Sequence, residues 1–125
     1  MLSRSLVLAG ALLVACGAAP HGPRALEDAH AFERLSAIAG AWQSTTDAGT
    51  VTADYALVSR GSALVETRVT ASGARTLTVY HPDHATVLLT HYCAQGNQAR
   101  LRLTEASATR FRFEREDATN VLPEQ

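Results

Sequence analysis

Residues 74–104 read ARTLTVYHPDHATVLLTHYCAQGNQARLRLT, and they carry the clearest indication of the fold class. It contains three runs rich in Val, Leu, Thr and Tyr, at 74–81, 86–93 and 98–104, and side chains alternate along them with a period of two. The turn sequences PDHA and AQGN separate the runs. Connections this short hold no crossover helix, so the stretch predicts an antiparallel meander.

The same pattern extends in both directions from this centre. Further strand-like runs lie at 42–47, 51–58, 63–71 and 109–115, and a helical pattern covers 26–39 before Gly40. We therefore expect a mainly β domain, an antiparallel up-and-down meander that forms a barrel behind a short N-terminal helix. Gly40-Ala41-Trp42, between this helix and the first strand, resembles the Gly-x-Trp entrance of lipocalin-like barrels, which implies a lipocalin-like barrel. Small barrels typically close with about eight strands, so seven predict an incomplete barrel, a truncated chain or closure by a second chain. An open edge carrying Phe111 and Phe113 would favour self-association through that edge.

The first 16 residues predict an export signal. Arg4 precedes the apolar run 6–14, which is too short to span a membrane, and Leu13-Val14-Ala15-Cys16 resembles the lipobox of bacterial lipoproteins. The resemblance implies a signal peptide at 1–15 and a lipidated Cys16. Two Pro and two Gly within residues 17–25 predict a tether, so the tether covers 16–25 and the β domain covers 26–125. Gly17 after the cysteine resembles the sorting pattern of outer-membrane lipoproteins facing the periplasm. The alternative is ordinary secretion, with Cys16 free or paired with Cys93.

Composition excludes several classes of protein. The chain has 125 residues, enough for one small domain, and 11 basic side chains balance 12 acidic ones at a net charge of −1. This balance does not suggest a nucleic-acid-binding surface. A hydrophobic content of 46% is too high for a disordered chain, and the apolar runs are too interrupted for a polytopic membrane protein.

Pairing the three central strands through their turns predicts two faces. In this register residue 80 opposes 87, and residue 91 opposes 100. One face then holds Tyr80, His91, Cys93, Gln98 and Arg100; the other holds Leu77, Val79, Leu88, Tyr92, Leu101 and Leu103. The second face is the more apolar and is the expected interior, whereas the reverse arrangement would make a polar ligand cavity. A slip of one residue would exchange the faces of a strand.

Chemically active residues gather in the same stretch. His91 and Cys93, completed by His81 or His84, have the ligand types that suit zinc or copper, but the spacing matches no known metal motif. His91 and Cys93 lie about 7 Å apart along a strand, which is long for a nucleophile and its base. The simpler interpretation is a buried Cys93 and ordinary polar histidines. Alternation favours a solvent-facing Glu66, with an inward Glu66 bound to Arg68 or a ligand as the alternative.

Four sequence blocks together resemble a family of uncharacterised bacterial secreted proteins. The blocks are FERLSAIAGAW at 32–42, GSALVE at 61–66, VYH at 79–81 and LTHYCAQGNQ at 89–98. The resemblance covers about residues 30–122 and implies a lipocalin-like, or calycin-like, domain. Members continue with further strands beyond a segment like 117–120, which implies a C-terminally truncated chain here. The family carries no established reaction and therefore implies architecture and candidate sites alone.

These observations together predict a lipid-anchored envelope protein that binds a small apolar molecule or a partner surface in its barrel. The candidate ligand-binding residues are Glu66, Tyr80, His91, Cys93, Asn97 and Gln98. A metal-binding or thiol enzyme centred on His91 and Cys93 is one alternative, and a binding protein is favoured over it. A structural envelope protein without a ligand is the other.

Overall fold

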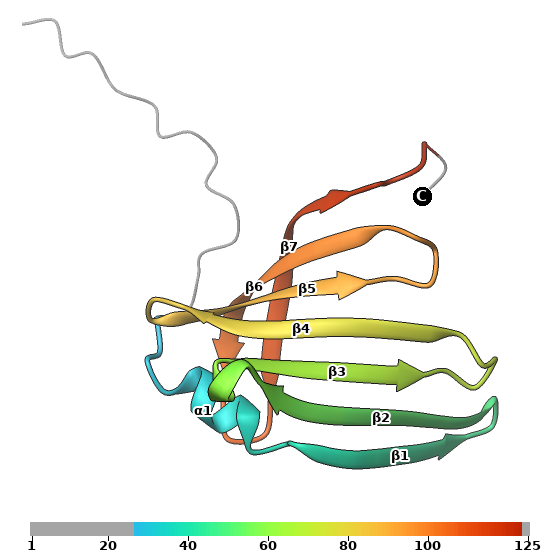
Figure 1. The fold of residues 1–125 in the computed structure, drawn as a ribbon, viewed down its shortest axis with the longest axis horizontal. Coiled ribbons are helices and arrows are strands. Elements are labelled where there is room, and N and C mark those ends of the chain that lie inside the picture. The colour runs from blue at the N-terminus through green and yellow to red at the C-terminus, as the bar shows by residue number, and fades with distance from the viewer. Residues whose placement is uncertain (1–26, 124–125) are drawn as a thin grey trace, which may run out of the picture.

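The computed structural model describes residues 27–123 as one short helix followed by a seven-stranded sheet (Figure 1). The helix is α1 (Ala31–Ser36), and a 3₁₀ turn at Ser59–Gly61 separates β2 from β3. The strands are β1 (Gly40–Thr46), β2 (Gly49–Val58), β3 (Ala63–Val69), β4 (Arg75–Asp83), β5 (Thr86–Tyr92), β6 (Gln98–Ala106) and β7 (Phe111–Thr119). The predicted mainly β architecture and its seven strands are confirmed. The predicted leader, lipidation site and tether at 1–25 lie outside the described residues.

The helix is shorter than the sequence pattern predicted. It ends at Ser36, where the backbone N–H groups of Ala37 and Ile38 bond to carbonyls three residues back, at Arg34 and Leu35. Such bonds tighten the last turn, and the chain leaves the helix there to enter β1. Within the described residues, no helix is long and apolar enough to cross a membrane.

Each strand pairs with its neighbour in the chain, and all pairs are antiparallel. The sheet curls strongly, with α1 at one end of it, but it ends at β1 on one side and β7 on the other (Figure 1). The described residues therefore form an open curved meander and not a closed barrel.

The register differs from the predicted one at both central turns. Tyr80 pairs with Leu89 because β4 and β5 extend to a tight turn closed by Asp83 and Thr86. This change moves the pairing by two residues and leaves the faces unchanged. Tyr92 pairs with Gln98, so the next turn holds the five residues 93–97, and His91 opposes Ala99 instead of residue 100. This one-residue shift moves Arg100 to the opposite face and brings Leu101 and Leu103 to the face of Tyr80.

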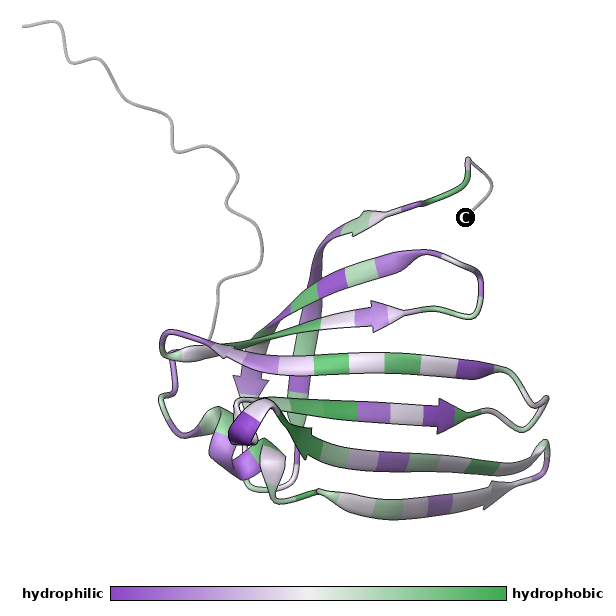
Figure 2. Cartoon of the chain, viewed as in Figure 1, coloured by the Kyte–Doolittle hydropathy of each residue, from purple (hydrophilic) through white to green (hydrophobic). Residues whose placement is uncertain are grey.

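The predicted interior was the wrong face of the sheet. We call the face that carries Leu64, Tyr80, Leu89, Leu101 and Leu103 the inner face, because α1 packs against it. The most deeply buried side chains are Leu64, Val87 and Leu103, clustered with Ala31 and Leu35 of the helix. On the outer face Leu77 and Tyr92 are 37% and 44% exposed. Figure 2 shows more and less hydrophobic residues alternating along β4 and β6, whose successive side chains point to opposite faces.

The two aromatic side chains of the β7 edge are partly covered by the core. Phe111 and Phe113 pack against the core cluster, and Phe113 meets the Tyr80 ring edge-on with centroids 5.8 Å apart. The guanidinium of Arg34 lies 5.9 Å from the centroid of Phe111. Both side chains are half-buried, so the core covers part of the aromatic surface at the β7 edge. Every residue of β1 is exposed, including Trp42 at the other edge.

Candidate functional site on the inner face

A buried carboxylate lies on the inner face of β3. Glu66 is 8% exposed and accepts a hydrogen bond of 2.9 Å from the Tyr80 hydroxyl of β4. The expectation of a solvent-facing Glu66 was wrong, because Glu66 follows the buried Leu64 by two residues and shares its face. Buried polar groups need partners, and a phenol now supplies one that the inward alternative had assigned to Arg68 or a ligand.

Two tyrosines near this carboxylate have raised pKa values. Burial raises the pKa of Tyr55 to about 12, and the charge of Glu66 and a hydrogen bond to it act in the same direction. Burial, followed by the same carboxylate, also raises the pKa of Tyr80 well above its usual range. Both phenols thus keep their protons at neutral pH and serve as donors toward Glu66.

A second polar pair lies one strand further on. The side chains of Thr78 and His91, which are opposite each other on β4 and β5, form a hydrogen bond of 2.9 Å between Oγ1 and Nδ1. Thr78 is buried and His91 is half-buried. This bond holds the imidazole at the inner face beside Tyr80 and Glu66.

These two pairs border a ligand-sized hollow of about 400 Å³. Its lining residues are Glu66, Arg68, Thr78, Tyr80, Leu89, His91, Ala99 and Leu101. Leucine and alanine side chains supply its apolar wall, whereas the carboxylate, phenol and imidazole supply a polar one. Within residues 27–123, the guanidinium of Arg68 forms no hydrogen bond or ion pair. Three of the six predicted ligand-binding residues, Glu66, Tyr80 and His91, therefore meet at one site.

The other three predicted residues lie at the turn between β5 and β6. The Cys93 thiol contacts Oε1 of Gln95 at 4.0 Å, and its backbone N–H bonds to the carbonyl of Asn97. The Gln98 amide donates to the carbonyl of Gly96 and accepts from the Thr119 hydroxyl. Cys93 and Gln98 thus help to close this turn, and neither they nor Asn97 line the inner hollow.

The structure does not bring the candidate metal ligands together. His81 is exposed on the outer face, whereas His91 is on the inner face. His84 lies at the tip of the β4–β5 turn with its side chain 97% exposed. Among residues 27–123, no three His, Cys, Asp or Glu side chains are close enough to hold a metal ion. Cys93 forms no disulfide within this part of the chain.

Sequence reasoning missed Tyr55 and the apolar wall. Tyr55 continues the alternation of Val51 and Ala53 on β2, which are all half-buried, so its inward direction was readable from spacing. Ala99 and Leu101 were assigned to the wrong face by the one-residue shift of β6.

The fold and site together define a small open β meander with a ligand-sized inner hollow. Comparisons with known protein families, curated proteins and solved structures found no match.

Proposed function

We propose that this protein binds a small, largely apolar molecule in the inner hollow, as a lipid-anchored protein of the bacterial envelope. The observation that carries the proposal is the hollow of about 400 Å³, which Leu89 and Leu101 line together with the hydrogen-bonded Glu66–Tyr80 pair. Sites for small ligands typically measure 300–1,000 Å³ and combine apolar walls with a few fixed polar groups.

The polar side of the hollow is preorganised for one end of the ligand. Thr78 holds His91, and Tyr80 holds Glu66, so these side chains lose little further freedom on binding. The exposed guanidinium of Arg68 adds a positive charge at the same side. A ligand with a hydrocarbon body and one hydrogen-bonding end matches the apolar and polar walls of the hollow. A sugar or a nucleotide fits less well, because it would place polar groups against leucine.

The hollow can be tested by filling it. The substitution Ala99→Phe adds a ring to the lining, and Ala94→Phe adds the same ring at the exposed β5–β6 turn. With the neutral fluorophore N-phenyl-1-naphthylamine as a probe, we expect Ala99→Phe to weaken binding at least tenfold and Ala94→Phe to leave it unchanged. Circular dichroism confirms that both variants fold. Equal binding by both variants, or no binding by the parent chain, would exclude this function.

The envelope location is a separate part of the proposal and rests on residues 1–17. Mass spectrometry of protein purified from a Gram-negative host would show an acylated Cys16 as the first residue. Cys16→Ala should release the protein from the membrane fraction. An unmodified Cys16 in membrane-free protein would refute the anchor and leave the binding domain unaffected.

A further inference from the structure

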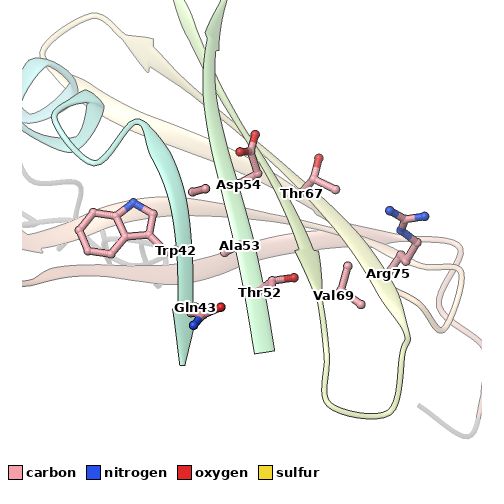
Figure 3. A pocket seen from close by; sticks show the side chains of 9 residues that line it. Trp42, Gln43, Thr52, Ala53, Asp54, Thr67, Val69 and Arg75 are labelled. Atoms are coloured by element: carbon pink, nitrogen blue, oxygen red, sulfur yellow. The ribbon is translucent and has the colours of Figure 1, made fainter. Parts of the chain in front are cut away.

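A second hollow, of about 390 Å³, lies over β1 to β4 and away from the inner site (Figure 3). Its lining residues are Ala41, Trp42, Gln43, Thr52, Ala53, Asp54, Thr67, Val69 and Arg75. Asp54 pairs with Thr67, and Val69 pairs with both Thr52 and Arg75, so these five side chains share the outer face of the sheet. This hollow contains none of the residues of the inner hollow.

Two opposite charges in this hollow have no partners. Within residues 27–123, neither the Asp54 carboxylate nor the Arg75 guanidinium forms a side-chain hydrogen bond or an ion pair. Several charges on β6 and β7 are paired: Arg100 with Asp117, Arg102 with Asp83 and Glu116, and Arg112 with Glu114. Arg100, Arg102 and Arg112 on β6 and β7 therefore have acidic partners, whereas Asp54 on β2 and Arg75 on β4 have none within residues 27–123.

The register explains why Asp54 and Arg75 do not pair with each other. They lie two strands apart, because Asp54 is on β2 and Arg75 is on β4, and two residues apart along the strands. Strand spacing and rise place their Cα atoms about 12 Å apart. Both charged side chains project from the sheet on the same side in Figure 3, with Thr67 and Val69 between them. The space between the charges is thus bordered by a hydroxyl and a methyl-bearing side chain.

We propose that this outer hollow binds a short zwitterion, with its ammonium at Asp54 and its carboxylate at Arg75. Arginine recognises a carboxylate through two parallel hydrogen bonds, and a carboxylate accepts from an ammonium. A free amino acid carries both charges on one carbon and is too short to reach both groups. An extended chain adds about 3.3–3.6 Å per residue, so the two ends of a di- or tripeptide match the gap. The Thr67 hydroxyl lies on the strand between the two charges, where it can bond to an amide group of such a peptide.

The glycine series tests the proposal because its members carry the same two terminal charges, without side chains, at increasing separation. Backbone amide shifts of β2 to β4 are followed by NMR during titration with glycine, diglycine and triglycine at constant ionic strength. We expect diglycine or triglycine to bind at least tenfold more tightly than glycine. N-acetylation of the peptide, or amidation of its carboxylate, should each weaken binding at least tenfold. Equal binding of glycine and the blocked peptides, or no shift with any of them, would overturn the proposal.

Variants locate the binding to the two charges. Asp54→Asn and Arg75→Gln should each weaken binding of the best peptide at least tenfold. Asp47→Asn and Arg110→Gln make the same changes at exposed turns outside the hollow, and both should bind as the parent chain does. Tyr80→Phe, on the inner face, should also leave peptide binding unchanged, which separates this site from the inner one. Equal losses in the matched controls would mean nonspecific charge attraction and refute the site.

Discussion

The Tyr80 hydroxyl and the Glu66 carboxylate form a hydrogen bond of 2.9 Å between neighbouring strands on the inner face of the sheet. The bond lies beside the apolar core, since the Tyr80 ring also packs edge-on against Phe113 of β7. Tyr80 therefore links β3, β4 and β7, and it connects the core to the polar wall of the inner hollow. A carboxylate this buried is stable when its partners are present and costly when they are removed.

Removal of the Tyr80 hydroxyl tests how much its hydrogen bond to Glu66 stabilises the fold. Tyr80→Phe keeps the ring and its packing but deprives Glu66 of a donor, and hydrogen bonds to charged groups contribute about 1.5–3 kcal/mol. We expect the free energy of unfolding, measured by urea denaturation, to fall by roughly that amount. Tyr92→Phe is the matched control on the exposed outer face and should change little. A Tyr80→Phe variant as stable as the parent would show that water replaces the phenol.

The raised tyrosine pKa values predict a loss of stability in alkali. Below pH 10 the phenols are protonated in both the folded and the unfolded chain, so their contribution is fully present. As the pH rises from about 10 to about 12, Tyr55 ionises first in the unfolded chain, and the folded state loses stability. Thermal denaturation should therefore give a falling midpoint across this window, and Tyr55→Phe should reduce the fall. If the thermal midpoint of Tyr55→Phe fell as steeply with pH as that of the parent chain, the ionisation of other groups would account for the loss of stability.

Two leucines distinguish the inner face from the outer one. Leu103 is fully buried on β6, and Leu77 is 37% exposed on β4. Leu103→Ala should lower the free energy of unfolding by about 2–5 kcal/mol, as core truncations do, because it opens a cavity beside α1. Leu77→Ala should cost about 1 kcal/mol or less. Similar costs for the two variants, measured by denaturant titration, would contradict this assignment of the faces.

The strands were predictable because each has its own period-two alternation and is bounded by turn residues. The interior was not, because a strand such as 63–69 offers two apolar sets, one with Val65 and Val69 and one with Leu64. Only the neighbouring strands decide between them, and their register depends on turn length. The five-residue turn 93–97 moves β6 by one residue and brings Leu101 and Leu103 inside.

The candidate site was likewise predictable in part from the sequence. Tyr80 and His91 share a face under either register of β4 and β5, because the observed pairing differs from the expected one by two residues. Glu66 joins them through the pairing of β3 with β4, which no local pattern specifies. Cys93 was grouped with His91 by spacing alone, and the turn that begins at Cys93 separates it from the inner hollow.

The position of Cys93 gives the last prediction. Its thiol contacts Gln95 in the β5–β6 turn and does not line the inner hollow, so Cys93→Ser should retain binding of N-phenyl-1-naphthylamine there. Its free energy of unfolding should change by about 1 kcal/mol or less. His91→Ala serves as the positive comparison, because His91 lines the hollow and its loss removes the partner of Thr78. If Cys93→Ser instead weakened binding as much as His91→Ala, the two residues would belong to one site, as the alternative centred on His91 and Cys93 requires.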